Sequence, residues 1–249
     1  MSARVTNLIL RPRSRPDFGR RSDAQEWLDR PDIDPRELAA VLRDLARFNK
    51  ALLGHYPILR WLEGALRGFA PGRPTVIVDA GCGYGDLLRS IARWAQRRGL
   101  PVSLVGIDLN PETIRIARTA AAPRERIEFV VGDALHFASP GPVDVIVNSL
   151  LAHHLPDSGI EALLRWMEAT AQRGWLIADL QRHPVPYYAI AAAGALLRVH
   201  PVVVSDGRIS VTRSLTRAEW ERRLTAAGLP PGAASVRWFL YRWLIGRLR

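Results

Sequence analysis

The chain has 249 residues, of which 48% are hydrophobic and 24% are charged. These proportions exclude a disordered or collagen-like chain, and the length fits one large α/β domain. Cys82 is the only cysteine, so no internal disulfide can form and a reducing, cytoplasmic location is expected. Residues 1–21 contain no apolar segment long enough for a signal peptide. Residues 187–204, the longest low-charge stretch, are interrupted by Gly194 and Arg198, which predicts a buried or substrate-covering helix and no membrane span.

The formal net charge of +11 is compatible with a nucleic-acid partner. However, Lys50 is the only lysine, and the arginines are spread along the chain instead of forming one run. This pattern favours a compositional bias toward arginine over a binding patch. A small molecule is therefore the expected partner, and RNA is the alternative.

The region before the first predicted strand is expected to form two parts. Residues 1–21 are rich in arginine and proline, which predicts a flexible basic arm. Residues 22–70 are expected to form a helical cap over a binding site. Ser22-Asp23 can begin one helix, and Asp34-Pro35 is typical of the start of another. The apolar residues of this second helix recur at helical spacing: Leu38, Val41, Leu42, Leu45 and Phe48.

A glycine-rich turn is the main motif of the chain. An apolar run ends at Asp79 and is followed by glycine at alternate positions, Gly81, Gly83 and Gly85. This order predicts a strand, a tight turn and a helix N-terminus, where backbone N–H groups face a ligand and no Cβ blocks its approach. A dinucleotide fingerprint would need glycine one position after Gly85, where Asp86 stands, which argues against NAD.

Strands and helices alternate after this turn. Further strands are expected over residues 102–108, 127–131, 143–148 and 174–179, with helices between them. The alternation predicts a parallel sheet that binds ligands at the carboxyl ends of its strands. Asp108 ends the second strand, where a carboxylate can bind both hydroxyls of a ribose.

The predicted domain, residues 71–249, continues beyond the fifth strand. A substrate-covering insertion is expected at about residues 183–215, with a turn at Asp206-Gly207-Arg208. A capping box starts the next helix at Thr216. Residues 235–248 are rich in aromatic and β-branched residues that do not share one helical face, which favours a final hairpin over an amphipathic membrane helix.

Over about residues 74–179 the motif order resembles the class I S-adenosylmethionine-dependent methyltransferases, and residues 151–157 and 176–182 resemble a bacterial subgroup that methylates small polyketide or quinone-type molecules. The chain departs from that subgroup at His55-Tyr56, where smaller side chains are expected. The resemblance implies a Rossmann-like, mostly parallel seven-stranded sheet with helices on both faces. It implies S-adenosylmethionine as cofactor, with Asp133 on the adenine amino group. The implied cofactor-binding residues are Asp79, Gly81, Gly83, Gly85, Asp108, Leu109, Asp133, Ala134 and Asn148.

His153 and His154 follow the fourth strand, whose end faces the transferred methyl group in this family. We expect one of them to face the substrate and favour His154 as general base, with a purely structural role for both as the alternative. Asp179 and Arg182 could pair, either to bind a polar substrate group or to hold their loop. The spacing of Cys, His and acidic residues along the chain predicts no metal site.

The sequence thus predicts O-methylation of a small, largely apolar phenolic, polyketide or quinone-like acceptor by in-line methyl transfer. The alternatives are an RNA methyltransferase and a non-catalytic protein that binds S-adenosylmethionine.

Overall fold

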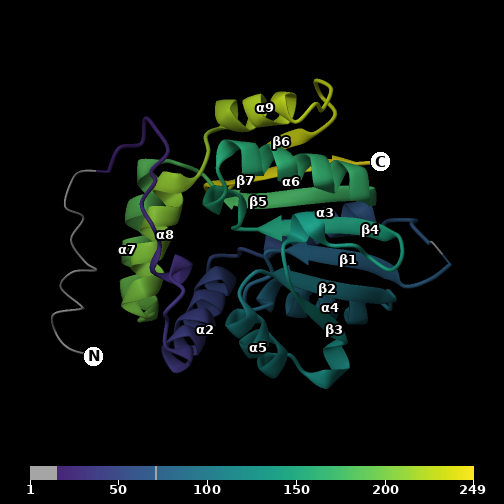
Figure 1. Cartoon of the computed structure of the whole chain (residues 1–249), viewed down its shortest axis with the longest axis horizontal. Helices are drawn as coiled ribbons and strands as arrows, with labels where there is room; N and C mark the ends of the chain where they lie inside the picture. The colour runs from purple at the N-terminus through teal and green to yellow at the C-terminus, as the bar shows by residue number, and fades with distance from the viewer. Residues whose placement is uncertain (1–15, 71) are drawn as a thin grey trace.

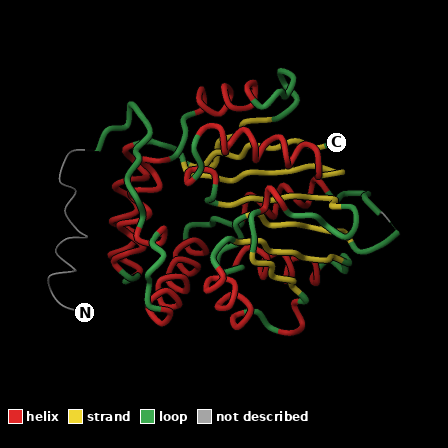
Figure 2. The backbone as a smooth tube through the Cα atoms, viewed as in Figure 1, coloured by secondary structure: helices red, strands yellow, loops and turns green. Residues whose placement is uncertain are grey.

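The computed structural model describes residues 16–70 and 72–249 of the chain. These residues form a seven-stranded sheet with the order β3-β2-β1-β4-β5-β7-β6 (Figures 1 and 2). Strands β1 to β5 pair in parallel, and β7 and β6 add an antiparallel edge. The strands are β1 (Thr75–Ala80), β2 (Val102–Asp108), β3 (Ile127–Val131), β4 (Val143–Ser149), β5 (Ala171–Leu180), β6 (Ser235–Phe239) and β7 (Arg242–Leu248). The predicted Rossmann-like sheet, including its final hairpin, is confirmed.

Helices cover both faces of this sheet. On one face lie α3 (Tyr56–Ala65), α4 (Asp86–Arg97) and α5 (Pro111–Ala120), whose apolar residues share one core cluster. On the other face lie α6 (Asp157–Thr170) and α9 (Arg217–Ala226), which share a second cluster.

Neighbouring residues of β1 serve the two layers alternately, as the period of a strand requires. Ile77 belongs to the cluster that contains Leu62 and Leu88, whereas Val78 belongs to the cluster that contains Leu163 and Trp175. All six side chains have at most 1% of their surface exposed. Burial of an aliphatic side chain of this size stabilises the fold by about 1.5–3 kcal/mol. The carboxyl end of β1 is therefore held from both sides of the sheet.

A third group of helices lies beyond the carboxyl ends of the parallel strands (Figure 1). It consists of α2 (Pro35–Ala51), α7 (Pro184–Leu197) and α8 (Pro201–Arg213). α2 begins where the sequence predicts, because the Asp34 carboxylate accepts hydrogen bonds from the first free backbone N–H groups. These helices have an apolar core of their own: Val41, Phe48, Tyr187, Ile190, Val202, Val203 and Val211.

Several boundaries differ from the predictions. No α-helix follows Ser22-Asp23; a short 3-10 helix, η1 (Trp27–Asp29), is present instead. The turn predicted at Asp206-Gly207-Arg208 is wrong, because α8 runs through these residues. Gly207 has no Cβ, which leaves space for the side chain of Ile190. α3 belongs to the sheet layers and not to the cap.

The predicted arm over residues 1–21 lies outside the described residues except for its last six. Of these, Arg21 is fixed, since its guanidinium donates to the carbonyl oxygens of His153, Leu155 and Arg213. In the described ranges, no helix has the length and apolar character of a membrane span.

Candidate active site

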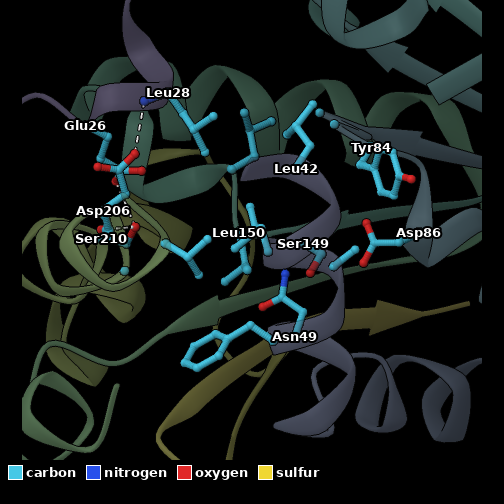
Figure 3. A pocket seen from close by; sticks show the side chains of 18 of the residues that line it. Glu26, Leu28, Leu42, Asn49, Tyr84, Asp86, Ser149, Leu150, Asp206 and Ser210 are labelled. Atoms are coloured by element: carbon cyan, nitrogen blue, oxygen red, sulfur yellow. Dashed lines mark hydrogen bonds between the residues drawn. The ribbon is translucent and has the colours of Figure 1, made fainter. Parts of the chain in front are cut away.

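A cavity of about 1070 Å³ lies between the carboxyl ends of β1, β2 and β4 and the helices α2, α7 and α8. This volume is at the upper end of the range for ligand sites, which is roughly 300–1,000 Å³. Figure 3 shows Tyr84 and Asp86 of the glycine-rich turn at one end and Glu26 beside Ser210 at the other, with Leu42 and Leu150 between them. The cavity thus has two polar ends joined by an apolar middle.

The glycine-rich turn forms one wall of this cavity. Gly81, Gly83 and Gly85 all have positive φ, at 74°, 49° and 70°. A Cβ on Gly83 would meet nothing within 4 Å, whereas a Cβ on Gly85 would lie 2.6 Å from the ring of Phe129. Gly83 therefore leaves backbone open to a ligand, and Gly85 is required by packing.

Asp108 lies beside this wall, at the end of β2. Its carboxylate accepts hydrogen bonds from the backbone N–H groups of Gly83 (2.9 Å) and Asn110 (3.0 Å). Burial raises the pKa of Asp108, although these two hydrogen bonds oppose the shift. The carboxylate is thus held against the turn, at the place predicted for a ribose.

Asp79 is the most unusual group at the end of the cavity that the glycine-rich turn forms, called here the cofactor end because the predicted cofactor residues lie there. It is 2% exposed and lines the cavity, yet its Oδ1 atom has no hydrogen-bond partner among the described residues. Burial, together with the carboxylates of Asp86 and Asp108, raises the pKa of Asp79 well above its usual value. A buried, unpartnered carboxylate is costly on its own and fits a cationic group of a ligand.

His55, where the chain departs from the resembling subgroup, holds Asp86 in place. Its Nδ1 lies 3.0 Å from Ser90 Oγ, and its Nε2 lies 3.0 Å from Asp86 Oδ2. Burial tends to raise the pKa of Asp86, but the contact with His55 outweighs it and the pKa is lowered. His55 therefore acts on the shape and charge of the cofactor end.

The cavity includes some predicted cofactor residues and excludes others. It is lined by Asp79, Gly81, Gly83, Asp108 and Leu109. It does not reach Gly85, Asp133, Ala134 or Asn148.

Each excluded residue has another role. The Asp133 carboxylate accepts from Leu135 N–H and lies 3.0 Å from His136 Nδ1, and Ala134 follows it in this turn. Asn148 is fully buried, and its amide donates to the Ala80 carbonyl at the end of β1. Contact of these residues with a cofactor stays a prediction.

At the other end of the cavity, both predicted histidines line the wall, and that only one of them faces the substrate stays a prediction. They lie in a 3-10 turn, η4 (Ala152–His154), with ring centroids 4.4 Å apart. The His153 backbone N–H donates to Asp179 Oδ2 (2.9 Å), and its Nδ1 lies 2.6 Å from Asp179 Oδ1. Burial lowers the pKa of His153, but the carboxylates of Asp179 and Glu26 outweigh it and raise that pKa to about 9.

Two further acids complete this cluster, and the sequence analysis missed both. His154 Nδ1 lies 3.0 Å from Asp29 Oδ1. Glu26 Oε1 lies 3.6 Å from His153 Nε2, and Glu26 Oε2 lies 3.8 Å from His154 Nε2. Glu26 precedes His153 by 127 residues, so no local spacing could indicate this contact. The spacing along the chain could not indicate that one ligand atom each of Glu26, His153 and His154 lie within 4.8 Å of one another, and the expected absence of a metal stays a prediction.

The segment that carries Glu26 is attached to α8. The buried Asp206 carboxylate accepts from the backbone N–H groups of Trp27 and Leu28, both at 3.0 Å (Figure 3 shows the second bond). Ser210, one turn further along α8, donates to Glu26 Oε1 at 2.8 Å. The position of α8 therefore determines whether Glu26 and Asp29 lie beside the two histidines.

Asp179 and Arg182 do not pair with each other. Asp179 contacts His153, whereas the buried Arg182 guanidinium donates to both carboxylate oxygens of Glu219 and to the Ser214 carbonyl. Arg182 therefore joins the end of β5 to α9 and does not line the cavity.

Residues 77–174 match a family model described as a methyltransferase domain. Trans-aconitate 2-methyltransferase of Streptomyces avermitilis is 33% identical over 110 residues, which cover 43% of this chain and 39% of that protein. Ubiquinone biosynthesis O-methyltransferase of Cupriavidus pinatubonensis is 27% identical over 177 residues, covering 69% of this chain and 65% of that protein. The chain thus spans about two fifths to two thirds of the length of these curated relatives.

Among solved structures, the plantazolicin methyltransferase BpumL in complex with SAH aligns with a TM-score of 0.57 and 21% identity, covering 82% of this chain and 78% of that one. At this identity the likeness is one of fold. Residues 77–174 are therefore similar to a methyltransferase domain, and the fold is that of the class I, Rossmann-like methyltransferases.

Proposed function

We propose that this protein binds S-adenosylmethionine and transfers its methyl group to an oxygen of a small, largely apolar acceptor. The observation that carries the proposal is the two-ended cavity. A glycine and carboxylate wall forms one end, and an imidazole and carboxylate cluster forms the other. The apolar middle places the two ends in one enclosed volume.

The cofactor end has the donors and acceptors that this cofactor requires. Gly83 gives open backbone, Asp108 offers carboxylate oxygens to ribose hydroxyls, and Asp79 offers an unpartnered carboxylate to the cofactor's ammonium group. When bound, S-adenosylmethionine supplies a methyl group activated by a sulfonium. The chain's contribution at this end is to bind and orient.

The acceptor end favours an apolar molecule with one ionisable hydroxyl. Apolar side chains of the cap line the cavity: Leu38, Leu42, Leu45, Leu52, Ile190 and Val203. This composition fits a quinone-type or phenolic acceptor, as the name of the ubiquinone relative suggests, better than a tricarboxylate.

In the metal-free protein, His154 is the residue that can accept the hydroxyl proton. His153 is unsuitable, because its raised pKa keeps it protonated near neutral pH. The contact between His154 Nδ1 and Asp29 favours the tautomer in which Nε2 is free to accept a proton. The new O–C bond forms as the methyl group leaves sulfur, and the proton passes to His154. Positioning contributes roughly 7–11 kcal/mol to such a reaction, and a general base about 10²- to 10⁴-fold in rate.

The basic charge does not require a nucleic-acid partner. Described arginines that pair with carboxylates include Arg21, Arg73, Arg93, Arg98, Arg182, Arg213, Arg217, Arg223 and Arg247. These pairs engage guanidinium groups that would otherwise be free to contact phosphates, although the net charge of +11 already counts the acids.

The test has two steps. Calorimetry should show binding of S-adenosylmethionine and no binding of NAD. Labelled methyl transfer should then be measured to a panel of phenols, enols, quinols, carboxylates, amines and RNA. Transfer to RNA that persists at about 0.2 M salt would replace the proposal with the RNA alternative. Binding of S-adenosylmethionine without transfer to any member of the panel would favour the non-catalytic alternative.

A further inference from the structure

We propose that Glu26, His153 and His154 bind one divalent transition-metal ion at the acceptor end of the cavity. The proposed role of this ion, which is to hold the acceptor oxygen, rests on the function proposed above. The site itself rests on the geometry of the cluster.

The three side chains are close enough to share one ion. Glu26 Oε1 lies 3.6 Å from His153 Nε2, Glu26 Oε2 lies 3.8 Å from His154 Nε2, and one ligand atom from each residue lies within 4.8 Å of the other two. Tetrahedral ligands at about 2.0–2.1 Å from Zn²⁺ lie roughly 3.3 Å apart, so small side-chain movements bring these atoms to coordinating distance.

His153 Nε2 gives an independent indication. The side chain is 2% exposed, and its Nε2 atom is buried without a hydrogen-bond partner among the described residues. Buried polar atoms of this kind are normally satisfied. An ion between His153 and Glu26 would satisfy this atom.

Each histidine also has the outer partner that metal-binding histidines usually have. His153 Nδ1 contacts Asp179 Oδ1, and His154 Nδ1 contacts Asp29 Oδ1. A carboxylate on Nδ1 fixes the ring and leaves Nε2 directed at the ion. Both Nε2 atoms of this cluster approach the same Glu26 carboxylate.

The charges of the cluster leave room for a divalent cation. Glu26, Asp29 and Asp179 carry three negative charges, and Arg213, 2.6 Å from Asp29 Oδ2 and 3.7 Å from Glu26 Oε1, carries one positive charge. Binding of the ion would displace the proton of His153, and with both imidazoles neutral the sum is −2, which one divalent ion balances. Asp206 is left out of this sum, because its carboxylate accepts from the Trp27 and Leu28 N–H groups and contacts none of the three ligand side chains.

Two histidines and one carboxylate are ligands of catalytic Zn²⁺ sites and of non-haem Fe²⁺ sites, both of which keep open positions. All three side chains line the cavity, so an open position would face the acceptor. A hydroxyl bound to the ion would lose its proton to solvent water more easily, since the ion stabilises the oxyanion. The ion would then replace His154 as the group that activates the acceptor.

The experiment uses the full chain after treatment with a chelator. Calorimetry with Zn²⁺, elemental analysis and the visible absorption of bound Co²⁺ should show one ion per chain. Glu26→Gln and His154→Gln should each abolish this stoichiometric binding. Asp179→Asn should weaken it by about 10- to 100-fold, as is typical of an outer-shell partner. His200→Asn is the matched control, because it removes an imidazole but keeps a residue that can cap α8, and it should bind Zn²⁺ like the wild type.

Circular dichroism and S-adenosylmethionine binding verify that each variant is folded. Because His154 is only half-buried, His154→Gln does not disturb the core. Zn²⁺ binding that is equal in Glu26→Gln, His154→Gln and the wild type would overturn the site, as would the absence of stoichiometric binding to the wild type. Methyl transfer that is unchanged by chelator would overturn the role of the ion and leave His154 as base. Failure of S-adenosylmethionine to bind the chelated chain would instead refute the proposed function, whatever the result with Zn²⁺.

Discussion

Asp79→Asn should stabilise the ligand-free protein while weakening its binding of S-adenosylmethionine. The wild-type carboxylate is 2% exposed, lacks a partner for Oδ1 and is close to two further acids. Asparagine keeps a buried polar side chain but removes the negative charge next to Asp86 and Asp108, so the free energy of unfolding should rise by about 1–2 kcal/mol. Loss of a charge-assisted hydrogen bond to the cofactor's ammonium group costs about 1.5–3 kcal/mol, or roughly 10- to 150-fold in Kd.

The stability gain should depend on pH in a defined direction. In the unfolded chain Asp79 ionises near its ordinary pKa of 3.8, but in the folded chain that pKa is raised and the proton is retained to higher pH. The free energy of unfolding of the wild type therefore falls as the pH rises above about 4, whereas the variant lacks this dependence. The advantage of Asp79→Asn should be small near pH 3 and should grow toward neutral pH.

Urea unfolding at several pH values and calorimetry in buffers of different ionisation enthalpy measure these effects. Binding of the cofactor should release a proton from wild-type Asp79 and none from the variant. Glu128→Gln, on the exposed surface of β3, is the control for loss of one carboxylate. A variant that is less stable than the wild type at neutral pH, or that binds the cofactor equally well, would refute the assignment of Asp79.

Two further predictions concern the turn and the last helix. Gly85→Ala should reduce the free energy of unfolding by about 2–5 kcal/mol, because the strain of its φ of 70° adds to the contact of its Cβ with Phe129. Gly83→Ala should cost only about 1–2 kcal/mol for its φ of 49° but impair cofactor binding more. Urea unfolding and calorimetry compare the pair, and equal effects on binding would contradict the distinction. Arg182→Met should cost about 3–5 kcal/mol, because Glu219 is left without its buried partner. The double variant with Glu219→Gln should lose less than the sum of the single changes in urea unfolding, and strict additivity would count against the pair.

The sheet and the cofactor end could be predicted because their signals are local. The apolar run before Asp79, the alternate glycines and the acid at the end of β2 each lie within a few residues of the structure they specify. Parallel pairing then brings Asp79 and Asp108 to the same edge, as the register of Ala80 with Ile107 shows. The same reasoning places Asp133 one strand further out, where its carboxylate turns toward its own 3-10 helix.

The acceptor end could not be predicted in this way, because it depends on contacts between distant segments. Glu26 lies in a short irregular segment without periodicity, and only Asp206 and Ser210 of α8 bring it to His153. The local pattern around Asp206 favoured a turn, because glycine is unfavourable within a helix. The helix forms nevertheless, since Gly207 lets α8 pack closely against Ile190.

The cofactor end is held by the sheet and the acceptor end by α8, so binding of the cofactor and binding of the acceptor depend on different parts of the fold. Changes that move α8 would displace Glu26 and Asp29 through the Asp206 anchor and leave the Asp79 and Gly83 wall in place, because that wall is held by the sheet. Acceptor specificity can therefore vary with the cap while cofactor binding stays constant. Asp206→Ala tests this coupling directly, since loss of two hydrogen bonds to the Trp27 and Leu28 N–H groups should reduce Zn²⁺ binding and methyl transfer. The affinity for S-adenosylmethionine should change less than about threefold, below the effect of one lost hydrogen bond. A parallel loss of cofactor affinity would show that the two ends are not independent.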